Sequence, residues 1–142
     1  MEDTKKLLEE CNSGCKMAIN SMEQVLEYAR DEKQKEILMD YKEQHEHLEQ
    51  ESSMQLKEAG WEEKEPKAMA SAMSWFTTEI KMMKEDDSHQ IAKLMMDGCN
   101  MGVQSVCEYQ NRYPNASGTA KAIAENLIRV EEKFYQKMKP FL

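Results

Sequence analysis

Two stretches that share a short motif, ECNSGCKMAI at residues 10–19 and GCNMGVQSVC at residues 98–107, point to the architecture of this chain. Each contains the pattern Cys-Asn-x-Gly, and the two copies lie 88 positions apart (99 minus 11). A glycine inside a helix costs about 1 kcal/mol relative to alanine. Because this cost recurs at Gly14 and Gly102 in matching contexts, we interpret the chain as a duplicated helical hairpin in which both glycines allow two helices to pack closely.

Apolar residues around both copies recur every three or four positions, which is the spacing of a helix with one buried face. The pattern predicts four long helices and a shorter one between the second and the third, over residues 4–30, 32–59, 68–83, 89–113 and 119–138. Asp31 and either Asp87 or Ser88 are placed to cap helices. Gly60 is placed to end a helix, and Pro66 to begin the shorter one.

The composition supports an all-α fold and excludes several functions. With 142 residues, 5 glycines and 3 prolines, the chain is expected to form one all-α domain over residues 1–142. The net charge of −8 argues against nucleic acid and anionic lipid, which would repel the protein. The chain shows neither an apolar run as long as a membrane span nor a signal peptide. We therefore expect a cytoplasmic protein with no membrane insertion and with reduced cysteines.

Two hairpins joined by a long crossover describe the ferritin-like four-helix bundle, here with an extra short helix in the crossover. Three stretches carry a closer resemblance: LLEECNSG at 7–14, SAMSWFTTEIK at 71–81 and DDSHQIAKLMMDGCNMG at 86–102. They resemble small bacterial ferritin-like proteins of unknown function, among them the spore-coat-F-like and stress-associated families. The resemblance covers nearly the whole chain and implies the ferritin-like fold, but it implies no reaction.

Dinuclear metal sites of this fold use a Glu from each of two helices and a Glu-x-x-His motif from each of the other two. This ligand set is missing. A lysine precedes His45 by three residues, a glutamine precedes His47 by three, and Phe134 follows Glu131 at the same spacing. No Ser/His/Asp or Cys/His arrangement is recognisable either, so we expect no catalytic residues and no cofactor. The expected function is binding or self-association, with a homodimer or another protein as the partner. The alternatives are a small bundle that binds a metal ion or a ligand at a degenerate site and, less favoured, a di-iron oxidoreductase.

One polar constellation interrupts the predicted core. Tyr41, His45 and Ser52 lie on the inward stripe of the second long helix, and Glu131 lies on that of the last one. Buried polar groups need partners, so we expect His45 to pair with Glu131, which would favour the imidazolium form. The group is either a satisfied buried network or a partly solvated seam, or it is the remnant of a site for a metal ion or a small ligand.

Two further groups of residues leave alternatives open. Trp75 and Phe76 present a large apolar area in the crossover helix, which either covers a flank of the bundle or forms a homodimer seam. The four cysteines would suit a soft metal if their thiols converged, but free cysteine is also a common small core residue. The 13 methionines are expected to fill gaps in the core, where their flexible side chains adapt to irregular spaces.

Overall fold

The computed structural model describes residues 1–63, 66–83 and 87–142, and for residues 66–72 and 75 it describes the backbone alone. These parts of the chain contain helices and no strand, so the all-α prediction is confirmed. The elements are α1 (Glu2–Leu26), α2 (Glu32–Glu58), α3 (Pro66–Lys81), α4 (Ser88–Arg112), α5 (Gly118–Met138) and the 3-10 turn η1 (Lys139–Phe141). Within the described ranges, no helix combines the length and the apolarity that crossing a membrane requires.

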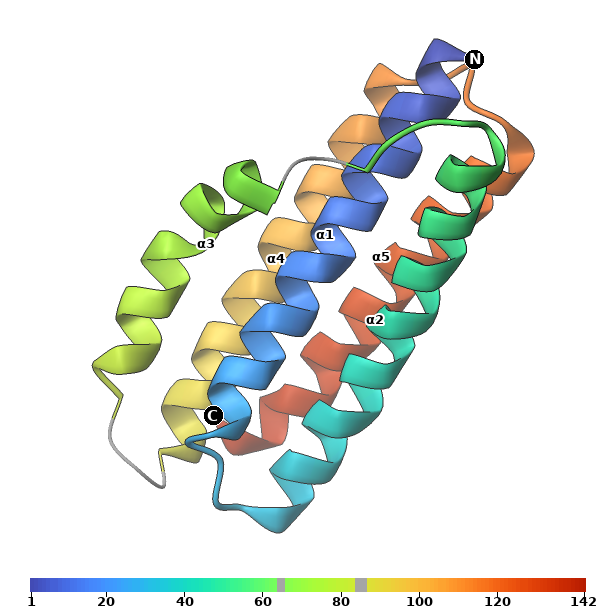
Figure 1. The fold of residues 1–142 in the computed structure, drawn as a ribbon. Helices are drawn as coiled ribbons and strands as arrows, with labels where there is room; N and C mark the ends of the chain where they lie inside the picture. The colour runs from blue at the N-terminus through green and yellow to red at the C-terminus, as the bar shows by residue number, and fades with distance from the viewer. Residues whose placement is uncertain (64–65, 84–86) are drawn as a thin grey trace.

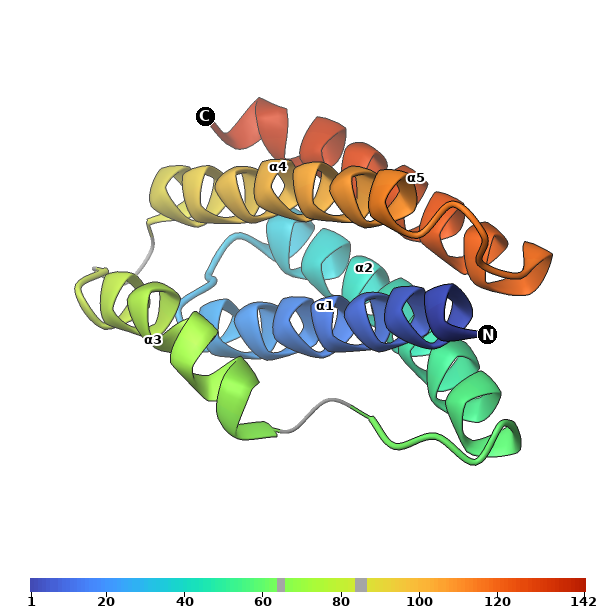
Figure 2. The same cartoon turned by 90° about the horizontal axis from the view of Figure 1, so that it is seen from above.

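The four long helices lie side by side as two antiparallel hairpins (Figure 1). α1 and α2 form the first hairpin, and α4 and α5 form the second. After α2 ends, the chain crosses the outside of α1, and α3 runs back toward the end at which α4 begins, so that α2 and α4 run in the same direction (Figure 1). α3 lies outside the four long helices, beside α1 and the start of α4 (Figure 2). It therefore covers one end of the α1–α4 side of the molecule.

Short-range hydrogen bonds set the starts of the helices, as the sequence predicts. Asp31 Oδ1 accepts a hydrogen bond from the backbone N–H of Gln34 at 2.9 Å and begins α2. Asp87 accepts one from the backbone N–H of Gln90 at 3.0 Å and begins α4. In a capping box, the Gln34 side chain would bond back to the backbone of Asp31. Here its Nε2 donates instead to the carbonyl of Ser88 at 2.9 Å. That bond links the starts of α2 and α4.

α2 ends at a glycine, again as predicted. Gly60 adopts a φ of +75°, a left-handed conformation that glycine reaches without a steric penalty. Its N–H donates to the carbonyl of Lys57 at 3.0 Å, and the N–H of Trp61 donates to the carbonyl of Leu56 at 2.9 Å. These two bonds satisfy the last carbonyls of the helix and turn the chain toward the crossover.

The core consists of two apolar clusters, one toward each end of the long helices. The first includes Met22, Leu38, Tyr41, Phe76, Ile91 and Phe134, and the second includes Leu7, Leu48, Leu56, Ile123 and Leu127. His45 and Glu131 lie along α2 and α5 where the first cluster gives way to the second. The core is therefore apolar at both ends and polar at one level between them.

Candidate functional site

His45 and Glu131 meet in the core although they lie 86 positions apart in the sequence. The His45 side chain is fully buried on α2, and the Glu131 side chain, from α5, is 8 % exposed. His45 Nε2 contacts Glu131 Oε1, and His45 Nδ1 lies 2.6 Å from the backbone carbonyl oxygen of Tyr41. Because a carbonyl oxygen can only accept, Nδ1 carries a hydrogen atom and donates it.

The contact with Glu131 favours a proton on the second ring nitrogen as well. Burial by itself lowers the pKa of His45, but the hydrogen bond to Glu131, the charge of that carboxylate and the Tyr41 carbonyl together outweigh it. The pKa of His45 is therefore raised above its ordinary value of 6.5. The favoured state is a buried imidazolium–carboxylate pair that connects α2 to α5.

Two other residues of the predicted polar constellation have roles that differ from the expected ones. Tyr41 contributes its backbone carbonyl to His45, while its ring stacks on Phe134 with centroids 5.0 Å apart. Ser52 does not face Glu131. It lies seven residues beyond His45, about 10 Å further along the helix, where it bonds to a residue of α1 instead. Ser52 lies on the same face of α2 as His45, as the sequence predicts, but its position further along the helix separates it from the His45–Glu131 pair.

Glycine and cysteine surround the rest of the Glu131 carboxylate. A Cβ atom at Gly102 would lie 3.0 Å from Oε2, so a larger residue there would displace the carboxylate. Burial first, and then Glu131, raises the pKa of the Cys99 thiol. Burial also raises the pKa of Cys15, with further contributions from neighbouring charges that include Glu131, and it raises the pKa of Cys11 to about 12. These thiols stay protonated and are poor nucleophiles in this state.

A pocket of about 240 Å³ lies between α1 and α4, and Glu131 reaches it from α5. Small residues form parts of both walls: Gly14 and Ala18 from α1, and Gly98 and Gly102 from α4. Phenylalanines from α3 and α5 and five methionines complete the apolar lining, which includes Phe76, Phe134, Met17, Met22, Met73, Met95 and Met101. The pocket is thus a mostly apolar space beside the buried histidine–glutamate pair.

The glycines do not bring two helices into contact, and the prediction drawn from the repeat is wrong on this point. A Cβ atom at Gly14 or Gly98 would have no neighbouring atom within 4 Å. Gly102 does make a close approach, but to the Glu131 side chain rather than to a helix backbone. All three glycines line the pocket. They therefore leave space between α1 and α4 instead of closing it.

The two copies of the repeat also differ in their surroundings. Asn12 is 1 % exposed, whereas Asn100, the equivalent residue of the second copy, is exposed. The next residue is buried in the first copy and exposed in the second, since Ser13 is 2 % exposed and Met101 is 58 % exposed. These two positions of the repeat are thus buried in the first hairpin and exposed in the second.

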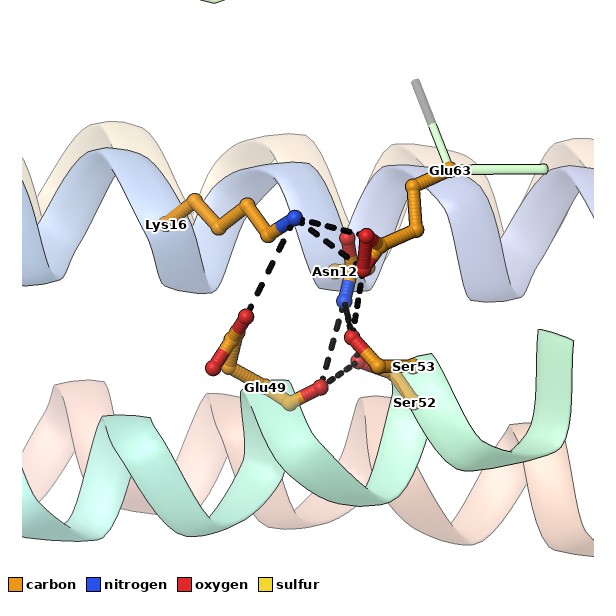
Figure 3. Close-up of polar contacts among 6 residues, drawn as sticks. All are labelled: Asn12, Lys16, Glu49, Ser52, Ser53 and Glu63. Atoms are coloured by element: carbon orange, nitrogen blue, oxygen red, sulfur yellow. Dashed lines mark hydrogen bonds and ion pairs between the residues drawn. The ribbon is translucent and has the colours of Figure 1, made fainter. Parts of the chain in front are cut away.

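Asn12 is the centre of a polar group between α1 and α2 (Figure 3). Its Nδ2 atom lies 2.8 Å from Ser53 Oγ, 3.0 Å from Ser52 Oγ and 3.2 Å from the carbonyl oxygen of Glu49. Ser52 in turn donates to the same Glu49 carbonyl at 2.9 Å. The buried amide of Asn12 is thereby satisfied, and it fixes α1 against the second half of α2.

The same group holds the segment that follows α2. Ser53 Oγ donates to Glu63 Oε1 at 2.6 Å, and Lys16 Nζ donates to both Glu63 oxygens at 3.0 and 2.9 Å (Figure 3). The hydrogen bond from Ser53 and then that from Lys16 lower the pKa of Glu63. Glu63 is therefore the point at which the beginning of the crossover is attached to the first hairpin.

Of the two aromatic residues predicted to form an association surface, Phe76 is 6 % exposed and belongs to the first apolar cluster, beside Ile80. Its area is covered by this chain and is not available to a second one. The side chain of Trp75 lies outside the described residues. Self-association through another surface stays a prediction.

Among the described side chains, no three His, Cys, Asp or Glu residues are grouped so that they could hold a metal ion. Both ring nitrogens of His45 are engaged, one by the Tyr41 carbonyl and one by Glu131. A metal ion at Nε2 would have to displace the carboxylate. The arrangement suits a pair that shares a proton better than it suits a ligand set.

Neither the pocket nor the Asn12 group follows from the sequence alone. The sequence signal for the pocket is a pair of small residues four positions apart in each hairpin, Gly98 and Gly102 in one and Gly14 and Ala18 in the other. The same pattern is equally typical of two helices that pack closely together. Comparison of the chain with protein-family models, with curated proteins and with solved structures finds no match in any of the three. The function has to be inferred from the chemistry of the site.

Proposed function

We propose that this protein binds a small, largely apolar molecule in the pocket between α1 and α4, and that it acts by binding rather than by catalysis. The pocket is the observation that carries this proposal. It offers about 240 Å³ beside the buried carboxylate of Glu131, with walls of glycine, methionine and phenylalanine. Ligand sites are typically concave and mostly apolar, with a few polar groups that fix orientation.

The glycines support binding because packing does not require them. Alanine at Gly14 or Gly98 would meet no neighbour and would favour its helix by about 1 kcal/mol. Glycine at these two positions therefore provides space at the expense of stability, a trade-off typical of functional sites.

The size and the lining of the pocket indicate the kind of molecule it fits. An apolar cavity of about 150 Å³ holds benzene, so a pocket of about 240 Å³ suits a molecule of bicyclic size. The five methionines provide flexible, polarizable side chains that adjust to irregular shapes. These properties favour an organic ligand over a single ion.

We further propose that the chain is a ferritin-like four-helix bundle. The parallel course of α2 and α4, joined by a crossover that contains α3, supports this proposal (Figure 1). In di-metal bundles, inward carboxylates and histidines hold the metals. Here one carboxylate and one histidine, Glu131 and His45, bind each other, and the space beside them is left for an organic ligand.

The test is isothermal titration of the protein with 1-naphthylmethanol, a neutral bicyclic probe. We expect the wild-type protein to bind one equivalent. In Gly14→Met, an unbranched side chain enters the pocket without a clash at Cβ and should abolish binding. Asn100→Met is the matched control, because it adds the same side chain to α4 at an exposed position that does not line the pocket.

Binding that disappears in Gly14→Met and persists in Asn100→Met supports the proposed function. Gly14→Met should melt at or above the wild-type temperature, so that a loss of binding reflects the filled pocket and not unfolding. Absence of binding by the wild-type protein, or equal binding by all three proteins, overturns the proposal.

A further inference from the structure

The described residues that line the pocket carry only negative charge. Glu10 of α1 and Glu131 of α5 line it, and no described lysine or arginine does. Tyr109 also lines it and keeps its proton, because burial and then the neighbouring Glu10 raise the pKa of its phenol. When His45 is neutral and no longer balances the charge of Glu131, such a lining repels an anion and attracts a cation.

The second oxygen of Glu131 lies on the pocket side, and the Cys99 thiol also hydrogen-bonds to this carboxylate. His45 occupies Oε1, whereas Oε2 faces Gly102, a residue of the pocket wall. The side chain is 8 % exposed, so the carboxylate is mostly desolvated but still reaches the pocket. A hydrogen bond from an ammonium group to a carboxylate of this kind is charge-assisted, and it is about twice as strong as a neutral one.

Aromatic and thioether groups complete the environment of a cation. Phe76, Tyr109 and Phe134 all line the pocket. A ring face attracts a cation within about 6 Å of its centre, although Tyr41 covers one face of Phe134, and Tyr109 already stacks on Tyr113 and has the Arg112 guanidinium 5.8 Å from its centre. The methionine side chains accommodate the apolar body of a ligand. Carboxylate and aromatic groups together offset the cost of taking an ammonium group out of water.

We propose that the ligand of this pocket is a small organic cation: an amine of about bicyclic size, with its ammonium group beside Glu131 Oε2 and its apolar body among the methionines between α1 and α4. This inference rests on the proposed function and adds the chemical class of the ligand.

Binding of a cation should also move a proton. The charges of His45 and Glu131 balance, so a second cation beside Glu131 leaves one positive charge in excess, and loss of the proton from His45 Nε2 removes it. Among the described residues, the Cys15 and Cys99 thiols interact with Glu131, and their raised pKa values keep them neutral. Affinity for an amine should therefore increase as the pH rises through the pKa of His45.

The experiment compares three probes with the same bicyclic ring: 1-naphthylmethylamine as the cation, 1-naphthylmethanol as the neutral analogue and 1-naphthoate as the anion. Titration calorimetry of the wild-type protein should show the amine binding at least about tenfold more tightly than the alcohol, and the anion most weakly. Between about pH 6.5 and 8.5 the affinity for the amine should rise, because an alkylamine keeps its proton in this range. The affinity for the alcohol should stay constant.

Glu131→Gln tests the assigned partner of the ammonium group. The Gln amide can donate to the bare Nε2 of a neutral His45, whose Nδ1 keeps its hydrogen bond to Tyr41, so the core stays satisfied. This variant should lose the preference for the amine and should still bind the alcohol. Glu10→Gln, which removes the other carboxylate of the lining, is the matched control and should keep most of the preference.

The possible outcomes separate the two proposals. If the alcohol binds as tightly as the amine, or the affinity for the amine does not change with pH, the cation proposal is overturned while the proposed binding function stands. If none of the three probes binds, both proposals fail. Tighter binding of the amine that depends on pH and is lost in Glu131→Gln supports both.

Discussion

Gly102 on α4 lies against the Glu131 carboxylate of α5, and a Cβ atom at position 102 would stand 3.0 Å from Oε2. The other oxygen of the same carboxylate contacts His45 of α2, so the carboxylate is held from the opposite side and has little freedom to withdraw. Three helices thus meet at one carboxylate. The pocket opens at this point because α4 presents no side chain there.

Alanine substitutions should distinguish Gly102, which lies against Glu131, from Gly14 and Gly98, which have open space beside them. Gly14→Ala and Gly98→Ala meet no neighbour and should each raise the free energy of unfolding by about 0.5–1 kcal/mol. Gly102→Ala should gain less or lose stability, because its Cβ atom presses on Glu131. Urea denaturation of the three variants gives the comparison. Equal gains at all three positions would show that the carboxylate is not held in place.

Removal of one partner of the buried pair should be costly. Glu131→Ala leaves the imidazole of His45 buried without its carboxylate and should lower the free energy of unfolding by about 3–5 kcal/mol. Glu131→Gln retains a hydrogen bond and should lose only about 1–3 kcal/mol. Both values come from urea denaturation at neutral pH. A loss below about 1 kcal/mol in Glu131→Ala would mean that the pair contributes little to the fold.

The stability of the protein should fall as the pH rises above neutral. The pKa of His45 is raised in the folded protein above its ordinary value of 6.5, so the folded state holds this proton more tightly than the unfolded chain does. The contribution of the pair is then complete below pH 6.5 and is lost as the pH rises through the folded pKa.

Denaturation measured between about pH 5.5 and 7.5 tests this effect. The pKa of Glu63 is lowered from 4.5, so this group titrates below the range. The buried thiols of Cys11 and Cys99, whose pKa values are raised in the folded protein, reduce stability only when the pH approaches the pKa of an unfolded thiol, about 8.5. The slope should disappear in His45→Gln. A slope that persists in this variant would assign the pH dependence to another group.

Asn12 and Asn100 occupy the same position of the repeat, but substitution should destabilise the protein at Asn12 and have little effect at Asn100. Asn12→Ala removes three contacts of a buried amide, to Ser53, Ser52 and the Glu49 carbonyl, and should lower the free energy of unfolding by about 1–3 kcal/mol. Asn100→Ala lies on the surface and should change it by less than about 0.5 kcal/mol. Thermal melts of the two variants side by side test this difference, and similar losses would contradict it.

The sequence allows the helices and part of the site to be predicted because these depend on local or periodic signals. Asp31, Asp87 and Gly60 mark helix ends through bonds to residues one turn away. The sequence also predicts that His45 and Glu131 meet, because each is polar on an otherwise apolar inward stripe and a buried polar group needs a partner.

The pocket and the Asn12 group depend on the distances between helices, and the spacing of apolar residues in the sequence does not determine these distances. Gly14 and Gly102 have the same local context, and the sequence cannot distinguish a glycine that lets helices touch from one that keeps a space open. Burial of Asn12 depends on two serines 40 and 41 positions away. Ser52 shares the stripe of His45 but lies at another level, so it joins Asn12 rather than Glu131.

The methionines allow the most direct test of ligand binding between α1 and α4, because their methyl groups report on the pocket by NMR. On addition of 1-naphthylmethylamine, the methyl signals of the pocket methionines Met17, Met22, Met73, Met95 and Met101 should shift through the ring current of the probe. The signals of Met39 and Met54, exposed on α2 and absent from the lining, should remain unchanged. Shifts at Met39 and Met54 alone, or no shift at the five pocket methionines, would contradict the account.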